Sequence, residues 1–593
     1  DYGFPQLMEN LKKHQGDFMV ACNNLVDDEG ELIFAPGGTA PIYADDTYET
    51  ELFRIAIVGM ATPETQTKAN PTKIKGLTFA TNDAFTKAAA DQVEALKDAD
   101  VVICLAHLGV DGESKPYRST DLYAAVKGID FIIDGHSHTV MTKGENGEPI
   151  QSTGTAFANI GVIVIDDATK KIESNSLFEI KEDTAKDATV AAAAQKIIDR
   201  IDKEYGAVFA KSEVVLNGAK APNGNRDSET NNGDLITDAM VWKILQDKES
   251  LTVDADHVVA VTNGGGIRKA INPGDVTKKN INEVLPFGNT VVTIYITGAE
   301  LLEALEASTY CTPDAIGGFP QVSGINYTIS TAVAYDANAE TYPASTYYGP
   351  KSINRVTINS INGKEFKADD TYAVITNDFC GGGGDTYYAF AAATAKFDTG
   401  IPLDEVVMEY ITAELKGVIG KQYAAPQGRI LMNPFADVKA SSWFGKYVID
   451  LYNDGIINGT SATTYAPNNT LTWAAALKLL LVSNGDLKAA DATGADWSKN
   501  AIAKAAELGL VAADLDGAKA ISRLEFCQVA AKLNKLAESK TESKFTDCTD
   551  GYVMALVDAK VISGMTETTF EPAASLTRAQ IAKILYQLTL IEK

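Results

Sequence analysis

The chain has 593 residues, a length that corresponds to several domains. Hydrophobic residues make up 45% of it and charged residues 22%, which is typical of folded proteins and excludes an intrinsically disordered chain. The formal net charge of −27 argues against a nucleic acid polymer as partner, because phosphate backbones are bound by Lys and Arg. No apolar run is long enough to predict a membrane span. The six cysteines are scattered, so they predict neither a zinc ribbon nor a disulfide framework.

The first segment, residues 1–181, alternates short apolar runs with amphipathic stretches, which predicts an α/β layered domain. Ligands of open α/β sheets bind beyond the carboxyl ends of the strands. His107 follows one predicted strand, and Asp134-Gly135-His136-Ser137-His138 follows the next. The pattern predicts helices over 4–14, 84–97 and 119–127, and strands over 17–22, 50–58, 101–106 and 131–133 and near 156–165.

Three of the five histidines in the chain lie at these two strand ends. Imidazoles at positions i and i+2 of a strand point to opposite faces, but a turn after Gly135 lets both rings converge. Imidazole is a common ligand of transition metals, so His107, His136 and His138 are candidate metal ligands. The alternative interpretation is that they are surface loop histidines.

The motifs Ala106-His107-Leu108-Gly109 and Asp134-Gly135-His136-Ser137-His138-Thr139 resemble the second half of a calcineurin-like metallophosphoesterase domain. The resemblance implies an α/β sandwich that holds two divalent metal ions of the zinc, manganese or cobalt type. It also implies that His107 and His136 bind one metal and His138 the other. Two such ions clamp phosphate oxygens and lower the pKa of a bound water, which then attacks phosphorus.

The family's earlier metal motifs, Asp-x-His, Gly-Asp and Gly-Asn-His-Glu, are absent from the sequence. The opening Asp1-Tyr2-Gly3 is similar to the continuation of the third motif. By this resemblance Asp1 is the catalytic-site carboxylate that orients a catalytic histidine, and that histidine and the bridging aspartate are missing. We therefore expect residues 1–181 to form a partial metallophosphoesterase domain with impaired activity.

The middle segment begins with a predicted linker helix within residues 182–205 and continues as a second domain over 206–433. Strands are predicted over 258–261, 291–296 and 372–376, and a helix over 235–245. Polar or glycine-rich motifs lie beside them. Glycines let backbone approach a ligand, a nearby Arg can bind an anion, and aromatic rings can stack on a base. Tight turns and core packing are the alternative for any one motif. The motifs are Arg226–Asp234, Thr262–Arg268, Leu285–Asn289 and Asn377–Asp385.

Together these four motifs resemble the α+β C-terminal domain of the 5′-nucleotidase family, which also includes UDP-sugar hydrolases and 2′,3′-cyclic-nucleotide phosphodiesterases. Asp234 stands where that family usually has Asn, and either residue can cap a helix. The resemblance implies a nucleotide-binding site. Arg226, Asn263 and Arg268 would contact the phosphate, Phe287 and Phe379 would stack on the base, and Asp385 would bind the ribose.

The last segment, residues 434–593, contains three weak repeats at about 434–484, 490–538 and 545–593. Each is predicted to form a helix, a loop and a Thr- or Ser-capped helix, and single units are too small to bury a core, so the three should stack. Phe435-Ala436-Asp437-Val438 and Leu576-Thr577-Arg578-Ala579 resemble S-layer homology modules, whose all-α bundle binds secondary cell-wall polymer. The resemblance implies that Arg523 and Arg578 bind polymer carboxylates, whereas Trp473 occupies the corresponding position of the first repeat. A generic helical repeat is the alternative.

These resemblances predict a multidomain, secreted protein of the cell wall or cell surface. Its predicted activity is metal-dependent hydrolysis of 5′-nucleotides to nucleoside and phosphate. One alternative is a UDP-sugar hydrolase or 2′,3′-cyclic-nucleotide phosphodiesterase, because the phosphate-binding residues are shared. The other is a non-catalytic, wall-bound nucleotide-binding protein, which is the expectation for a chain that truly starts at Asp1.

Overall fold

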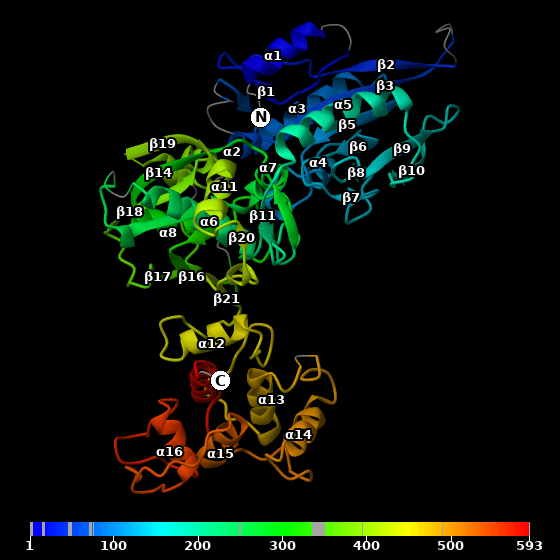
Figure 1. Ribbon diagram of the computed structural model, residues 1–593. Coiled ribbons are helices and arrows are strands. Elements are labelled where there is room, and N and C mark those ends of the chain that lie inside the picture. The colour runs from blue at the N-terminus through cyan, green and yellow to red at the C-terminus, as the bar shows by residue number, and fades with distance from the viewer. Residues whose placement is uncertain are drawn as a thin grey trace. The chain divides into compact units, whose positions relative to one another are not determined.

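Figure 1 shows the computed structural model, which forms two compact units. Unit one contains the described residues up to 325 together with 350–353 and 360–429, and unit two contains 326–334, 354–359 and 430–591. No helix of the described residues combines the length and the apolar character needed to cross a bilayer. The structure describes residues 4–14, 18–44, 50–69, 74, 76–247, 249, 251–334, 350–393, 395–488 and 490–591.

The first part of unit one is built on a six-stranded sheet of order β2-β3-β5-β6-β8-β7. The four central strands are parallel, and the two edge strands run antiparallel to their neighbours. Both faces of the central strands are covered, which explains their continuous apolar sequences. The strands are β2 (Gly37–Tyr43), β3 (Glu51–Ala61), β5 (Val101–His107), β6 (Phe131–Asp134), β8 (Ile150–Thr153) and β7 (Val140–Met141).

Helices cover one face of this sheet and a β-hairpin covers part of the other. Phe85 and Val93 of α3 (Asn82–Ala95) and Leu122 of α4 (Ser119–Ala125) join the core on the first face. Ile163 and Ile165, from the hairpin of β9 (Asn159–Ile165) and β10 (Ile172–Glu179), pack on the second. The short elements nearby are α1 (Phe4–Lys13), α2 (Thr65–Lys68) and the pair β1 (Leu25–Val26) and β4 (Thr78–Phe79).

The helices predicted over 4–14, 84–97 and 119–127 are confirmed, as are the strands over 50–58, 101–106 and 131–133 and near 156–165. The strand predicted over 17–22 is wrong. Residue 17 lies outside the described residues, and 18–22 make only isolated contacts, such as the Ala21–Ala35 bridge, because no continuous partner strand lies beside them. The sequence also missed β2, whose Pro41 is tolerated because the strand lies at the sheet edge.

The predicted linker helix is α5 (Ala188–Tyr205), and none of its residues is buried. The side chain of Asp187 caps it by accepting hydrogen bonds from the backbone N–H groups of Thr189 and Val190, both 2.9 Å long. The helix leads into β11 (Val208–Ser212), the first strand of the second part of unit one. The domain boundaries at 181 and 205 stay a prediction.

The second part of unit one contains a mixed five-stranded sheet of order β15-β12-β18-β14-β19. Only β12 and β18 are parallel, and their carboxyl ends therefore lie side by side. The long helices α6 (Asn231–Leu245) and α11 (Leu403–Ala413) share its core, and the predicted strands and helix of this segment are confirmed. The strands are β15 (Pro320–Ser323), β12 (Val258–Asn263), β18 (Thr371–Asn377), β14 (Thr290–Thr297) and β19 (Ala395–Pro402).

Smaller elements complete this part of the chain. A three-stranded sheet of order β13-β11-β20 carries β13 (Gly274–Thr277) and β20 (Val418–Ile419) on either side of β11. The remaining helices are α7 (Lys278–Val284), α8 (Gly298–Ser308), α9 (Asp378–Gly381) and α10 (Tyr388–Ala391).

Unit two contains a small sheet and three pairs of helices in its described residues. The sheet has the order β17-β16-β21, formed by β17 (Val356–Ile361), β16 (Ile325–Ser330) and β21 (Ile430–Asn433). One apolar core runs through all three helix pairs, as expected for repeats that cannot fold singly. The pairs are α12 (Gly445–Asn453) with α13 (Trp473–Asn484), α14 (Trp497–Glu507) with α15 (Arg523–Leu533), and α16 (Gly551–Asp558) with α17 (Arg578–Thr589).

The three pairs close into a ring through the starts of their second helices. Each start donates its first backbone N–H to the loop of the next pair, and the third pair returns to the first. The bonds run from Trp473 to the carbonyl of Lys519, from Arg523 to Ala574 and from Arg578 to Asn469, at 2.9, 2.8 and 2.8 Å. The fold class predicted from the sequence, an α/β, an α+β and an all-α part in one chain, is confirmed.

Candidate functional site

The carboxyl ends of three neighbouring parallel strands bring together Glu64, His107 and His136. His107 is the last residue of β5, His136 follows β6, and Glu64 follows β3. The rings of His107 and His136 are 5.2 Å apart between centroids and inclined at 65°. The carboxylate of Glu64 is buried, and its Oε2 lies 3.0 Å from Nε2 of His136. The arrangement places two imidazoles and one acidic side chain at a single edge of the sheet.

Backbone geometry fixes the loops that carry these histidines. His136 and His138 adopt left-handed conformations, with φ of +75° and +56°, which non-glycine residues adopt only where the surroundings hold them. The buried Asp134 supports the loops by accepting hydrogen bonds from the N–H groups of Leu108 and Gly109, at 2.9 and 3.2 Å. Glycine is favoured at position 109, because a Cβ there would lie 3.1 Å from Cδ2 of His136 and its φ is +76°. Such strain is typical of functional sites.

Imidazole nitrogens suit divalent transition metals, so the donor chemistry of His107 and His136 fits the predicted metal ions. Oδ2 of Asp134 is buried nearby and has no hydrogen-bond partner among the described residues. However, no three His, Cys, Asp or Glu side chains of the described residues are grouped closely enough to hold a metal. The residues present therefore supply part of a ligand set, and the metal roles of His107, His136 and His138 stay a prediction. Asp1 lies outside the described residues.

The pKa values of two of these histidines are depressed. Burial is the main cause for His107, and the neighbouring His136 adds to it. Burial also lowers the pKa of His138, followed by the positive charges of Arg268 and Arg226. A neutral imidazole is the form that binds a metal cation, so these surroundings favour the ligating state near neutral pH.

On the second sheet, the parallel strands β12 and β18 end in Asn263 and Asn377, whose side chains form one buried network. Asn263 donates from Nδ2 to Oδ2 of Asp385 at 2.7 Å and accepts at Oδ1 from Nδ2 of Asn377 at 3.1 Å. Asn377 also donates to Thr262 at 3.0 Å. The thiol of Cys380 donates to Asn263 at 3.4 Å, and burial raises its pKa, so it stays protonated. The network fixes Asn263 and Asp385, the predicted phosphate and ribose contacts.

Arg268 lies over Phe287, with 5.6 Å between the guanidinium carbon and the ring centroid. Burial lowers the pKa of Arg268, and the nearby positive charge of Arg226 lowers it further. An anion such as a phosphate relieves the repulsion between these two charges. Phe287 is 44% exposed, which leaves its ring open to a planar partner.

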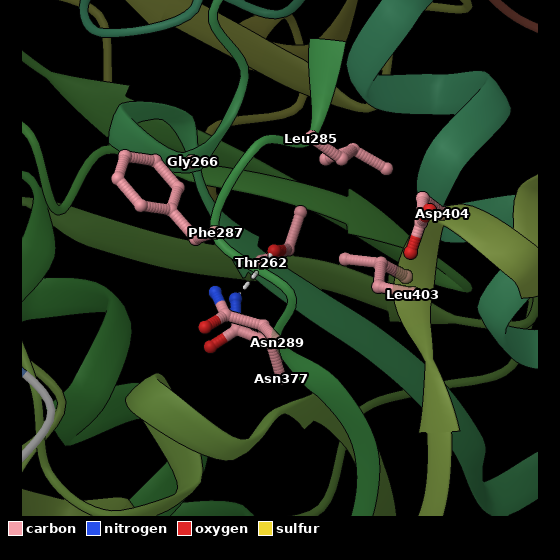
Figure 2. Close-up of a pocket in the computed structure, with 8 residues that line it drawn as sticks. All are labelled: Thr262, Gly266, Leu285, Phe287, Asn289, Asn377, Leu403 and Asp404. Carbon is pink, nitrogen blue, oxygen red and sulfur yellow. Dashed lines mark hydrogen bonds between the residues drawn. The ribbon is translucent and has the colours of Figure 1, made fainter. Parts of the chain in front are cut away.

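A shallow pocket opens beside Phe287, and Figure 2 shows the side chains around it. The carboxamides of Asn289 and Asn377 lie next to each other below Phe287, and the dashed line marks the bond from Asn377 to Thr262. The residues that line the pocket are Thr262, Gly266, Leu285, Phe287, Asn289, Asn377, Leu403 and Asp404.

Phe379 is more enclosed than Phe287. Its side chain is only 8% exposed, and Gly384 passes so close that a Cβ there would lie 2.4 Å from the ring. Asp385 follows with φ of +52° and is also buried. The structure thus brings Phe379 and Asp385 into one loop, and their base and ribose roles stay predictions.

Within unit one, Lys220 joins the loop that carries His136 and His138 to the backbone of Arg226. Its Nζ lies 2.8 Å from Oδ2 of Asp111 and donates to the carbonyl of Ser137 at 2.9 Å. Its own carbonyl accepts from the N–H of Arg226 at 3.1 Å. Arg226 is therefore joined through Lys220 to the loop of His136 and His138. The charges of Arg226 and Arg268 both act on His138, so these two predicted phosphate contacts lie near one predicted metal ligand.

The two arginines predicted to bind wall polymer take part in contacts between the helix pairs of unit two. Arg578 lies over Tyr465 at 4.4 Å, donates from Nε to the carbonyl of Tyr465 at 2.7 Å and donates from Nη2 to Asn458 at 2.8 Å. Arg523 lies over Phe570 at 4.7 Å and is 7% exposed. These contacts show a structural role for both side chains, and their polymer role stays a prediction.

We expect Arg578→Ala to lower the free energy of unfolding of unit two by about 1.5 kcal/mol, because it removes a cation–π contact and two hydrogen bonds to carbonyls. Calorimetric thermal unfolding would measure the change. Lys583→Ala, an exposed change on the same helix, is the matched control. Equal melting temperatures of the two variants would contradict the expectation.

Sequence reasoning missed Glu64, Lys220 and the bridging role of Asn377. Glu64 lies after β3 and so at the same sheet edge as His107, and the rule that located His107 would have found it once β3 and β5 were known to be neighbours. Lys220 belongs to no motif, and its partners come from distant loops. Asn377 directly follows the strand predicted over 372–376, and this position was the available signal.

Comparison with known proteins agrees with the motifs. Residues 208–392 match the family model described as "5'-nucleotidase, C-terminal domain". Residues 434–476 and 547–582 match the "S-layer homology domain" model. These matches cover the first and third predicted repeats, and the structure has a helix pair in the segment between them.

The chain is similar to nucleotide phosphoesterases along much of its length. It is 32% identical over 398 residues to the trifunctional nucleotide phosphoesterase protein YfkN of Bacillus subtilis, and the aligned region covers 64% of this chain. It spans only 24% of that longer protein. It is 27% identical to the human 5′-nucleotidase, covering 63% of this chain and 66% of that one. The structure of a 5′-nucleotidase precursor from Thermus thermophilus matches with a TM-score of 0.56 and 25% identity, over 72% of this chain and 80% of that one.

Proposed function

Since this chain belongs to the 5′-nucleotidase family and carries S-layer homology modules, we propose that it acts on 5′-nucleotides at the cell surface. The proposed reaction is hydrolysis of a phosphate ester to nucleoside and phosphate. The S-layer homology modules support attachment to a wall polymer. A phosphodiesterase or nucleotide-sugar hydrolase would use the same phosphate contacts, so the test below compares all three kinds of substrate.

One observation carries the proposal. Unit one holds two arginines, a half-exposed aromatic ring and a buried Asn–Asp network, and Lys220 joins the backbone of one of these arginines, Arg226, to the histidine loop. This combination supplies an anion contact, a stacking surface and a polar contact for a sugar beside candidate metal ligands. A generic anion site would need only Arg226 and Arg268.

We further propose that the reaction depends on divalent cations, because imidazoles of this edge suit such ions and the similar proteins are phosphoesterases. Bound cations would supply polarisation of the phosphate and a water of lowered pKa. The residues of this chain would hold the nucleotide: Arg226 and Arg268 on the phosphate, Phe287 and Phe379 on the base and Asp385 on the ribose.

The direct test is phosphate release from AMP by the purified chain with and without added manganese. UDP-glucose and 2′,3′-cyclic AMP serve as competing substrates, and calorimetry measures AMP binding in parallel. We expect AMP to bind and to be the preferred substrate. Binding of AMP without release of phosphate would indicate a non-catalytic nucleotide-binding protein. Absence of AMP binding would contradict the proposal altogether.

Attachment to the wall has a separate test. A chain cut after Asn433 keeps β21 and loses all three helix pairs. We expect purified wall polymer to retain the full chain in a pull-down and to release the cut chain. Equal retention of both forms would remove the proposed role of the S-layer homology modules, and unchanged AMP binding by the cut form is the control for its folding.

A further inference from the structure

The two ring nitrogens of His136 have different surroundings. Nε2 lies 3.0 Å from Oε2 of Glu64, whose side chain is only 2% exposed. Cδ2, the carbon next to Nε2, lies against Gly109. Nδ1, on the other side of the ring, forms no hydrogen bond among the described residues. The Nε2 edge of the ring is therefore held by the protein.

Glu64 is itself held by its own turn. The N–H of Thr62 donates to the carbonyl of His107 at 2.9 Å, which attaches the turn to the neighbouring strand. The N–H of Glu64 then donates to Oγ1 of Thr62 at 3.2 Å, and both side chains are almost fully buried. A carboxylate fixed in this way accepts hydrogen bonds and donates none, so the proton of a neutral His136 ring must reside on Nε2.

We propose that Glu64 is a positioning residue that holds the Nε2–H tautomer of His136 and thereby presents Nδ1 as the nitrogen that binds a divalent transition-metal cation. Histidines that bind metals commonly donate their other ring N–H to a carboxylate, which fixes the ring and raises its basicity. The left-handed backbone of His136, with φ of +75°, is consistent with a ring whose direction is set by such a contact.

Only the binding of a cation by His136 rests on the proposed function. The hydrogen bond and the tautomer are properties of the metal-free chain and can be measured there. The main probe is a long-range ¹⁵N correlation spectrum of the chain labelled with ¹⁵N-histidine, at about pH 8.5, about two units above the ordinary imidazole pKa of about 6.5. The chain has five histidines, and His136→Gln identifies the signals of His136.

In the native chain we expect a single tautomer of His136 with the proton on Nε2. Glu64→Leu removes the acceptor, and Glu64→Gln keeps the size of the side chain without its charge. Glu64→Leu should give a mixture of tautomers at His136, whereas in Glu64→Gln the amide oxygen can still accept from Nε2–H. Both variants should leave His257 unchanged, because His257 lies between Asp256 and Asp370 far along the chain. Glu51→Gln, which alters an exposed partner of Arg54 on β3, is the matched control and should change neither histidine.

A second readout is the affinity for Mn²⁺ or Co²⁺ alone, measured by calorimetry, which Glu64→Leu should weaken about 10–100-fold. A proton on Nδ1 in the native chain, or an unchanged tautomer in the Glu64→Leu variant, overturns the proposal even if AMP is hydrolysed. Absence of metal binding by the native chain, with the Nε2–H tautomer present and dependent on Glu64, sustains the hydrogen bond from His136 to Glu64 but overturns Nδ1 as a metal ligand and contradicts the proposed metal-dependent function. Far-UV circular dichroism identifies a variant that has not folded, and the tautomer of His136 in the native chain then decides.

Discussion

Arg268→Ala is expected to weaken AMP binding about 50-fold, which corresponds to about 2.3 kcal/mol. The guanidinium of Arg268 is partly buried over Phe287, and the positive charge of Arg226 acts on it. A phosphate bound there would be attracted by both charges, and a charge-assisted hydrogen bond to a charged group contributes about 1.5–3 kcal/mol. The alanine variant also loses the cation that covers the Phe287 ring. Calorimetric titration with AMP measures the change without requiring turnover.

Two further variants separate a phosphate contact from a general charge effect. Arg268→Lys keeps the positive charge but loses the planar fork, so its affinity should lie between those of the native chain and the alanine variant. Arg200→Ala removes an exposed arginine from α5 and should leave the affinity unchanged. An affinity of the Arg268→Ala chain within twofold of native would remove Arg268 from the proposed site.

The stability of unit one is expected to fall by about 5 kcal/mol between pH 4 and pH 8, and Asp234→Asn should abolish most of that fall. Asp234 is buried in the first turn of α6, and burial and the charge of Glu229 raise its pKa to about 8. Arg429 opposes the shift from 3.5 Å, but it lies closer to Asp238, at 2.8 Å, and Asp238 raises the pKa of Asp234 further.

Stability falls as the pH rises because the folded and unfolded chains release the proton of Asp234 at different pH values. An unfolded Asp loses its proton near pH 4, whereas the folded chain keeps the proton on Asp234 up to about pH 8. The folded state is therefore favoured fully below pH 4, and this contribution is lost as the pH rises through that window. Asn has the size of a protonated Asp and carries no charge, so the variant should be more stable than the native chain at pH 8.

Denaturant unfolding followed by the fluorescence of Trp242 tests this in a chain cut after Asn433, where Trp242 is the only tryptophan. Asp275→Asn, an exposed change on β13, should leave the native pH dependence intact. A fall of the same size in native and Asp234→Asn chains would show that other groups cause it.

The environment of Asp234 could not be predicted from the local sequence. From the sequence, Asp234 is one of two interchangeable residues at a helix start. In the structure the cap of α6 is Thr230, whose side chain accepts from the N–H of Gly233 at 3.0 Å. Asp234 lies inside the first turn and faces Arg429, which comes from the end of the domain. The local sequence pattern identifies a helix start. Burial and charges from distant segments decide how much each residue there stabilises or destabilises the fold.

Motifs were more informative where chemistry depends on a short stretch of chain. The pattern around Gly135 and His136, the glycine-rich turns before Arg268 and Asp385, and the repeats after residue 433 were all recognisable because neighbours in sequence stay neighbours in space. The family and the fold class predicted from them are confirmed. Site roles that depend on a ligand stay predictions.

The sequence by itself determined the α/β, α+β and all-α organisation, the strand ends that carry His107 and His136, and the family to which the chain belongs. Only the tertiary structure showed that Glu64 holds Nε2 of His136, that Lys220 joins Arg226 to the histidine loop, and that Arg578 contacts Tyr465 of another repeat. The physical reason is the range of the interactions. Periodicity, capping and turn chemistry act over a few residues, whereas these contacts join segments that only the packing of strands and loops brings within hydrogen-bonding distance.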